Sequence, residues 1–323
     1  ILMNEIEESD YLHTSFKLGQ SKEEYRKEVS LVLEDGSCFK GKLFGYEKDV
    51  SGEIVFNTSM TGYPESLTDP SYKGQILVLT YPLIGNYGIP DEEIENGLRK
   101  HFESDFIHVS ALIVDDLSGA HNHWNSALSL DEWLKQNKIP GIYGVDTRAL
   151  TKKIRDHGTL LAKIKVNNDV GFYDPNKINL VEEVSIKAVK NYGDGGLKIV
   201  VVDCGVKNNI IRCLLKRGVS VIRVPHDYDF TSMDFDGVIV SNGPGDPKQC
   251  SRTIETIKKT LQLGKPFFGI CLGNQLLGLA IGMGTYKMKF GHRSSNQPCI
   301  DTENKRCYIT SQNHGFALDS GKI

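Results

Sequence analysis

The sequence has no excess of basic charge and no long apolar run. Its 38 lysine and arginine residues stand against 41 aspartate and glutamate residues, which leaves a net charge of −3. A chain without a basic surplus cannot hold a nucleic-acid backbone by releasing counterions, so general nucleic-acid binding is disfavoured. No segment approaches the roughly 20 apolar residues that span a bilayer, and the acidic first residues do not resemble a secretory signal. We therefore expect a soluble globular protein with neither a nucleic-acid partner nor a membrane.

Closely spaced cysteine pairs are also missing. The sequence has no Cys-x-x-Cys, and its seven cysteines lie far apart, at Cys38, Cys204, Cys213, Cys250, Cys271, Cys299 and Cys307. This spacing argues against a disulfide framework or a zinc cage and favours a reducing compartment, with the cytoplasm as the default. Most of these thiols are expected to be small buried apolar residues, and a reactive one must be argued from its surroundings.

Signatures of cofactor and metal binding are absent as well. No G-x-G-x-x-G follows a strand and no G-x-x-x-x-G-K-[ST] is present, so neither a dinucleotide site nor a P-loop is expected. His121 and His123 have a spacing that invites a metal, but no further ligand pattern accompanies them. We expect no metal and no cofactor in this chain.

The length of 323 residues favours two domains, and 39% hydrophobic with 24% charged residues is the composition of a globular chain. Residues 1–28 are polar without a sustained apolar period, which predicts an extension. Residues 29–165 contain strand-like runs broken by turn residues, beginning with a hairpin across Asp35-Gly36. A helix capped by Ser129 and another ending at Gly158 complete a β-rich first domain.

The pattern changes after residue 165. Residues 166–196 have weak periodicity and end in a glycine cluster, which is the composition of a linker. From residue 197 an apolar strand, a helix and a second strand form a βαβ unit, and the alternation continues through residue 282. We therefore predict an α/β fold: a β-rich N-terminal domain followed, over residues 197–323, by a doubly wound, mostly parallel α/β domain.

The sharpest chemical feature is the run Gly269-Ile270-Cys271-Leu272-Gly273. It has the form of a nucleophile elbow, in which the reactive side chain sits at a strained corner between a strand and a helix. The positive end of the helix dipole should favour the thiolate of Cys271, and the Leu272 amide should face a developing oxyanion. The alternative, a buried core cysteine, is disfavoured by this context.

Two other polar segments belong to the same argument. Residues 242–247 follow an apolar strand, and their two glycines expose amides at the sheet edge where open α/β folds bind ligands; the alternative is an ordinary Gly-Pro turn. Residues 312–316 are predicted to form a polar loop that could hold a substrate. His314 in this loop could be mistaken for the general base of a thiol nucleophile, but an isolated histidine is more often structural.

The motifs GICLGNQLLGLA, SNGPGDP and SQNHGFA together resemble those of class I, triad-type glutamine amidotransferases. The upstream stretches GEIVFNTSMTGYPESLTDPSYKGQILVLTYPLIGNYG and GIYGVDTRALTKKIRDHGTL resemble the N-terminal domain of the carbamoyl phosphate synthetase small subunit. The resemblance covers residues 30–323 and is strongest to the fused eukaryotic form of pyrimidine synthesis. It implies that L-glutamine is hydrolysed and ammonia is passed to a fused synthetase region or a large subunit. That partner, not this chain, uses ATP, magnesium and bicarbonate to make carbamoyl phosphate for pyrimidine or arginine biosynthesis.

The resemblance also implies roles for individual residues. The family's nucleophile, which forms a thioester, falls on Cys271, and its oxyanion donors fall on the amides of Gly243 and Leu272. His314 matches a family histidine near the substrate and not the catalytic base. The implied glutamine contacts are Ser71 of the first domain and Gly243, Gly245, Leu272, Gln275, Asn313, Gly315 and Phe316 of the second.

The sequence departs from the family pattern in two places. The family's base and its carboxylate come from a His-Pro-Glu motif downstream of residues 312–316, and the sequence ends at Ile323 before reaching it. We therefore expect a second domain truncated at its C-terminus and little activity from this chain alone. Asn274 replaces a histidine of most glutamine-dependent members, as in the ammonia-dependent branch, but that branch has lost the nucleophile and Cys271 is retained.

Two alternatives to a glutaminase remain. The first is a non-catalytic module that docks on a synthetase and regulates it, since the histidine and glutamate of the triad are missing. The second is an amidotransferase that serves another synthetase, such as those for GMP or anthranilate. Residues 30–165 disfavour the second alternative, because those amidotransferases lack this N-terminal domain.

Overall fold

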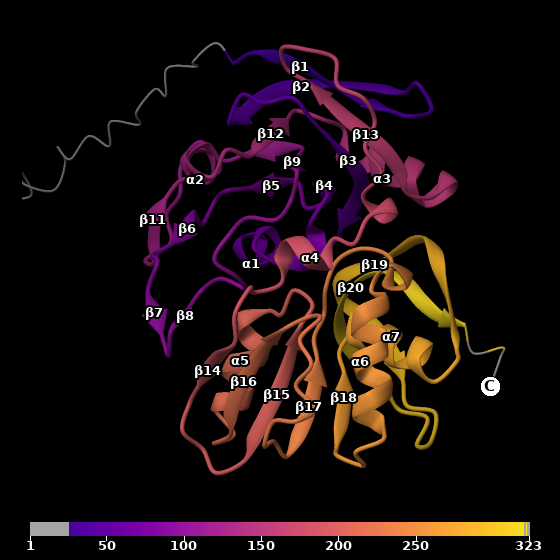
Figure 1. The fold of residues 1–323 in the computed structure, drawn as a ribbon. Helices are drawn as coiled ribbons and strands as arrows, with labels where there is room; N and C mark the ends of the chain where they lie inside the picture. Colours follow the sequence, from indigo (N-terminus) through magenta and orange to yellow (C-terminus); the bar gives the residue numbers. More distant parts are fainter. Residues whose placement is uncertain (1–25, 320, 322–323) are drawn as a thin grey trace, which may run out of the picture.

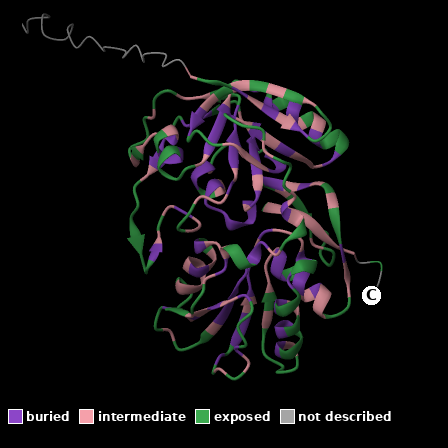
Figure 2. Cartoon of the chain, turned by 45° about the horizontal axis from the view of Figure 1, so that its top comes forward, coloured by how far each residue is buried: buried purple, intermediate pink, exposed green. Residues whose placement is uncertain are grey.

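The computed structural model describes residues 26–319 and 321. Most of the predicted extension, residues 1–28, therefore lies outside the described residues. The described chain forms a strand-rich part and an α/β part that pack against each other, drawn above and below in Figure 1. Buried residues concentrate in the strands of both parts (Figure 2).

Seven strands of the first part close into a barrel in the order β1-β13-β3-β4-β9-β12-β2. The strands β3, β4, β9 and β12 pair in parallel and the other pairs are antiparallel. The predicted hairpin across Asp35-Gly36 is the β1–β2 pair. The strands are β1 (Glu28–Leu33), β2 (Cys38–Gly45), β3 (Val50–Asn57), β4 (Gln75–Leu79), β9 (Ala111–Ile113), β12 (Pro140–Tyr143) and β13 (Leu160–Lys165).

Alternate residues of the barrel strands enter two apolar clusters. In β3, Ile54 joins one cluster with Leu150 of the helix α3, and Val55 joins the other with Trp133 of the helix α2. Successive side chains of a strand point to opposite faces, so one strand can contribute to both. The helices of this part are α1 (Tyr63–Leu67), the short 3-10 helix η1 (Pro70–Tyr72), α2 (Leu130–Gln136) and α3 (Thr147–His157).

The two longer helices begin and end where the sequence predicts. Ser129 caps α2 through the amide of Glu132, whose side chain bonds back to the Ser129 amide. The helix α3 ends at Gly158, which has a φ of 101°. Three pairs of short strands lie outside the barrel: β5 (Leu83–Ile84) with β10 (Asp116–Leu117), β6 (Ile89–Pro90) with β11 (Ser126–Leu128), and β7 (Ile94–Glu95) with β8 (Leu98–Arg99).

The predicted linker, residues 166–196, contains regular structure and ends inside the second sheet. It includes the 3-10 helix η2 (Pro175–Lys177), the helix α4 (Val181–Val184) and the strand β14 (Lys190–Tyr192). The strand β14 pairs antiparallel with β16. Elements of three or four residues are too short to show a period in the sequence, which is why the pattern did not reveal them.

The second part is built on a five-stranded sheet of order β14-β16-β15-β17-β18, parallel except for β14. Val200 and Val202 of β15 pack with the helices α6 and α7, whereas Val201 packs with α5. Helices therefore cover both faces, and the prediction of a doubly wound, mostly parallel domain is confirmed. Its elements are β15 (Lys198–Asp203), α5 (Asn208–Leu215), β16 (Ser220–Pro225), β17 (Gly237–Val240), η3 (Pro247–Gln249), α6 (Ser251–Leu261), β18 (Phe267–Gly269) and α7 (Leu272–Ala280).

A long antiparallel ribbon of β19 (Gly284–Ile300) and β20 (Cys307–Asp319) joins the two parts. Phe290 of β19 stacks on Phe56 of the barrel, with 6.0 Å between ring centroids. Gly278 of α7 approaches Leu318 of β20 so closely that an added methyl group would lie 2.2 Å from its Cδ2. The ribbon thus contacts the barrel and the α/β part together (Figure 1).

The prediction that residues 312–316 form a loop was wrong. These residues lie inside β20, where His314 faces His292 of β19. The polar residues and the glycine of this segment have low strand propensity. They form a strand because they pair with β19, which the sequence pattern did not predict. None of the helices within residues 26–319 is long and apolar enough to cross a membrane.

Candidate active site

Cys271 sits at the corner between β18 and α7, with a φ of 52° and a ψ of −106°. Such a backbone is strained for any residue but glycine, and strain of this kind concentrates at functional sites. A methyl group on Gly273 would lie 2.1 Å from the backbone oxygen of Val240, and one on Gly269 would lie 2.6 Å from the oxygen of Gly273. Both flanking glycines are therefore required for the close packing of this elbow.

The two predicted oxyanion donors lie on either side of this corner. The Leu272 amide is at the first position of α7 and helps to lower the pKa of the Cys271 thiol, while the Leu272 side chain is buried in the core. Gly243 follows β17, and a methyl group there would lie 2.1 Å from the oxygen of Cys204. This close approach is possible only for glycine, as expected where backbone amides face a ligand.

A small cavity opens beside the thiol. It brings together nearly all the site residues predicted from the sequence; Leu272 does not line it and contributes its amide only. The predicted residues that line the cavity are Ser71, Gly243, Gly245, Cys271, Gln275, Asn313, Gly315 and Phe316.

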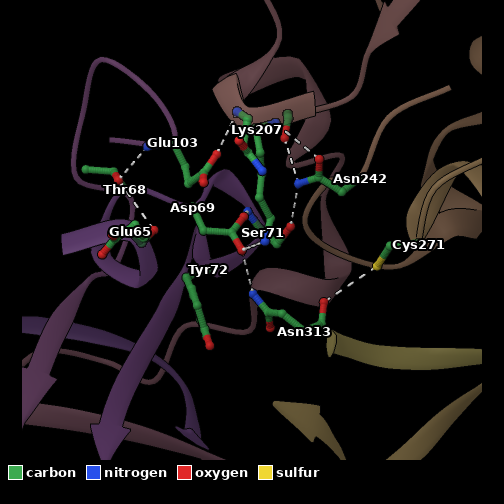
Figure 3. A network of polar contacts seen from close by, with 12 residues as sticks. Glu65, Thr68, Asp69, Ser71, Tyr72, Glu103, Lys207, Asn242, Cys271 and Asn313 are labelled. Atoms are coloured by element: carbon green, nitrogen blue, oxygen red, sulfur yellow. Dashed lines mark hydrogen bonds and ion pairs between the residues drawn. The ribbon is translucent and has the colours of Figure 1, made fainter. Parts of the chain in front are cut away.

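The first domain supplies Ser71 to this cavity through buried contacts with the second domain (Figure 3). The amide of Ser71 donates to Asp69 Oδ1 at 2.9 Å, which caps η1. Asn242, at the end of β17, donates from Nδ2 to Ser71 Oγ at 3.0 Å. With its oxygen accepting this bond, the Ser71 hydroxyl keeps its own proton for a ligand.

An ion pair between a buried carboxylate and a partly exposed lysine holds the same region together across the domain boundary. Lys207 Nζ lies 3.0 Å from Asp69 Oδ2, and Asn313 Nδ2 donates to the same oxygen at 3.0 Å. Burial alone would raise the pKa of Asp69, but the Lys207 ammonium and the bonds from Ser71 and Asn313 outweigh it and lower the pKa. Asp69 thereby orients two predicted glutamine contacts, Ser71 and Asn313, at once (Figure 3).

The strand β20 forms the wall of the cavity beside the elbow. The thiol of Cys271 donates to the backbone oxygen of Asn313, with 3.5 Å between sulfur and oxygen. Gln275 of α7 donates from Nε2 to the oxygen of Phe316 at 2.7 Å. Asn274, by contrast, is exposed and does not line the cavity.

The expected thiolate is not stabilised in this structure. The pKa of Cys271 is raised to about 11, first by burial and then by the nearby Asp69 carboxylate, and Lys207, the Leu272 amide and Arg293 only partly oppose them. The sequence argument considered the helix dipole alone and left out burial, which disfavours the charged form.

No histidine of residues 26–319 is hydrogen-bonded to Cys271. The ring nitrogens of His314 contact the Phe316 oxygen at 2.8 Å and Gln312 Oε1 at 3.0 Å. Burial lowers the pKa of His314, which favours the neutral ring. His314 therefore does not act on Cys271 as a base in this arrangement.

His121 and His123 are occupied by local contacts. His121 bonds to Ser126 at 2.6 Å, and His123 accepts from the Asn125 amide at 3.2 Å. No cluster of three or more metal-ligating side chains occurs in the part of the chain that the structure describes.

The cavity also contains charged residues that the sequence did not reveal: Glu53, Lys287 and Arg293. Glu53 is in the middle of β3 and the other two are in β19, more than 200 positions away along the chain. A glutamate inside a strand gives no signal that it is buried, so only the tertiary structure brings these charges together.

An elbow thiol at a helix N-terminus, with two backbone amides and a polar cavity around it, is the arrangement of a class I glutamine amidotransferase. The family model described as "Glutamine amidotransferase class-I" matches residues 200–322. A second model, "Carbamoyl-phosphate synthase small chain, CPSase domain", matches residues 31–164. The chain belongs to the carbamoyl-phosphate synthase small chain family.

Three relatives illustrate the range of this family. "Multifunctional protein CAD" from Squalus acanthias is 58% identical over 90% of this chain and 13% of the relative. "Carbamoyl-phosphate synthase [ammonia], mitochondrial" from Homo sapiens is 52% identical over 90% of this chain and 20% of the relative. "Carbamoyl phosphate synthase arginine-specific small chain" from Aspergillus oryzae is 46% identical over 91% of this chain and 68% of the relative. The chain thus spans only a fraction of the two longer relatives.

Proposed function

We propose that this chain is the glutamine-hydrolysing portion of a carbamoyl phosphate synthetase. The observation that carries the proposal is the elbow thiol of Cys271, which opens into a cavity walled by both domains. Because Ser71 comes from the first domain, residues of both matched regions line the cavity. An amidotransferase without the N-terminal domain would lack this wall.

The reaction follows from the positions of the backbone groups. The sulfur of Cys271 attacks the carboxamide carbon of glutamine, and the resulting oxyanion accepts bonds from the amides of Leu272 and Gly243. The C–N bond then breaks, ammonia leaves with the proton that the thiol gave up, and a thioester remains. Water hydrolyses the thioester to glutamate and returns a proton to the sulfur. An acid–base group must carry the proton between sulfur and nitrogen, and the resemblance assigns this task to the histidine of the family's His-Pro-Glu motif.

The ammonia is delivered to a synthetase, either fused to this chain or separate, which makes carbamoyl phosphate. The names of the relatives support both arrangements and both pathways, since they include multifunctional proteins and an arginine-specific small chain. All seven cysteines are free, which agrees with a reducing compartment, and we place the protein in the cytoplasm.

Covalent labelling tests this function directly. A chloroketone analogue of glutamine should alkylate Cys271, and excess glutamine should protect it, as read by mass spectrometry of the digested protein. Cys250 is the matched control, because it is buried and its pKa is raised to about 12 by burial. Absent labelling, or labelling spread over several cysteines without protection, would contradict the proposal.

A docking module is the second candidate. The raised pKa of Cys271, and the lack of a histidine bonded to it in the described residues, favour this reading. In a preparation that contains this region together with its synthetase, fused or separate, Cys271→Ser separates the two functions. A glutaminase predicts loss of carbamoyl phosphate synthesis from glutamine with synthesis from ammonia retained, whereas a docking module predicts no loss of either.

A further inference from the structure

The cavity contains one buried guanidinium whose hydrogen-bond donors are only partly satisfied, that of Arg293. Glu53 is 3% exposed, and its carboxylate is paired with Lys287 Nζ at 2.5 Å. It also accepts from Gln75 Nε2 at 2.8 Å and from Asn176 Nδ2 at 3.2 Å. Glu53 is therefore paired directly with Lys287, while Arg293 acts on it from further away and helps to lower its pKa.

Arg293 is 4% exposed and makes few bonds for a buried guanidinium. Its Nη1 donates to the oxygen of Phe290 at 2.7 Å, while its buried Nε has no partner among the described residues. No carboxylate of residues 26–319 forms an ion pair with it. The Glu53 carboxylate only partly offsets the burial that lowers the pKa of Arg293. A buried N–H without a partner is costly, and a carboxylate in the cavity would supply both that partner and further negative charge.

Two glycines leave room for this guanidinium at the cavity wall. A methyl group on Gly291 would lie 2.5 Å from Nη1 of Arg293, and one on Gly315 would lie 3.0 Å from Nη2. Gly315 is one of the predicted glutamine contacts and lines the same cavity as Cys271. The guanidinium therefore borders the space that the proposed substrate would fill.

We propose that Arg293 binds the α-carboxylate of glutamine and so selects a free amino acid over an amide side chain within a peptide. The inference rests on the proposed function. The contacts implied by the family resemblance are serine, asparagine, glutamine, glycine, leucine and phenylalanine, and none of them carries a charge for the substrate's carboxylate. A planar guanidinium can hold a carboxylate through two parallel bonds, which a lysine cannot do.

The experiment compares three reagents on the full chain and on Arg293→Gln and Arg293→Lys. The first reagent is the chloroketone analogue of glutamine, the second is its α-methyl ester, and the third is iodoacetamide. The rate of alkylation of Cys271 is measured for each by mass spectrometry. The ester removes the carboxylate charge and adds one methyl group, and iodoacetamide reports the reactivity of the thiol itself.

In the unaltered chain the free acid should react faster than the ester. Arg293→Gln should slow the free acid, relative to iodoacetamide on the same variant, by about 10- to 100-fold, the usual effect of losing a bond to a charged group. The ester should slow relative to iodoacetamide by less than about 2-fold; this ratio removes the effect of Arg293 on the thiol, whose pKa the guanidinium helps to lower. Arg293→Lys should restore part of the preference for the acid, because lysine keeps the positive charge but cannot make the two parallel bonds of a guanidinium. Circular dichroism and thermal unfolding establish that each variant is folded.

The outcomes separate this inference from the proposed function. If the unaltered chain shows glutamine-protected labelling but Arg293→Gln keeps its preference for the acid, the inference alone is overturned. If the acid and iodoacetamide slow together, Arg293 acts on the thiol and not on the carboxylate, which also overturns it. If Arg293→Gln does not fold, the test is the ratio of the Cys271 alkylation rates by the free acid and by its ester in the unaltered chain. A ratio near one refutes the inference. Unprotected labelling in the unaltered chain would instead reject the proposed function.

Discussion

Replacing Lys207 by methionine should destabilise the protein and disorder the substrate cavity, although Lys207 does not line the cavity that contains Cys271. The substitution removes the ammonium that lies 3.0 Å from Asp69 and leaves a buried carboxylate without its counter-charge. Asp69 bonds to Ser71 and Asn313, so its displacement should move two predicted glutamine contacts.

The magnitude follows from the geometry. Two charges 3.0 Å apart attract by about 5 kcal/mol at an effective dielectric constant near 20. The Lys207 side chain is 33% exposed, so solvent screens part of this attraction. Removing one partner of a buried pair costs about 3–5 kcal/mol, and the exposure of Lys207 places the expected loss near the lower end, about 3 kcal/mol.

Urea unfolding measures this loss, with two companion variants. Lys207→Met combined with Asp69→Asn should recover part of the stability, because no unpaired charge remains buried. Lys259→Met removes a partner of Asp229 at 3.2 Å, but both side chains are more than half exposed. This control should leave the unfolding midpoint unchanged.

The pH dependence gives a second check. The pKa of Asp69 is lowered in the folded protein, so its stabilisation is present above its unfolded pKa of about 3.9 and is lost as the pH falls through the folded value. Without Lys207 the pKa of Asp69 should rise, and its protonation should relieve the cost. The stability difference between the two proteins should therefore shrink on acidification. A loss below about 1 kcal/mol for Lys207→Met, or strictly additive single losses in the double variant, would refute the reasoning.

Three other predictions concern the elbow. Gly273→Ala should lower the free energy of unfolding in urea by about 1–3 kcal/mol, because the added methyl group would lie 2.1 Å from the Val240 oxygen. The control Gly119→Ala, whose methyl group would have nothing within 4 Å, should leave this free energy unchanged. Equal effects of the two substitutions would disprove the steric argument. The rate of Cys271 alkylation by iodoacetamide should still rise above pH 9, because burial raises the pKa of Cys271 to about 11, and a plateau below pH 8 would contradict this. The chain alone should show no steady-state release of ammonia from glutamine in a coupled assay, since no histidine of residues 26–319 is bonded to the thiol, and measurable turnover would count against this view.

The order of the main elements could be predicted because the sequence encodes them locally. Alternating apolar residues across Asp35-Gly36 predict the β1–β2 hairpin, and a continuous apolar run predicts β15. The position of Cys271 was predictable for the same reason, since the Gly-x-Cys-x-Gly pattern is local in the sequence, although Gly269 is required by contacts within the elbow and Gly273 by its contact with Val240 of β17.

Features that depend on distant partners could not be predicted. Gln312 to Phe316 look like a loop until β19 is seen beside them. The ion pair of Glu53 and Lys287 links β3 to β19, and nothing near either residue in the sequence indicates the other residue. The prediction that Cys271 has a stabilised thiolate failed for a related reason. Burial is a property of the folded chain, and it raises the pKa of the thiol against the effect of the helix dipole.

The backbone of Cys271 has a consequence for the balance between stability and activity. A φ of 52° in a residue with a side chain costs about 1–3 kcal/mol, and a glycine would remove this cost while removing the thiol. At this one position, therefore, the residue that would relieve the backbone strain is also one that would end the chemistry. The fold holds the cysteine against the conformational preference of its own backbone, so relief of the strain and retention of the thiol exclude each other.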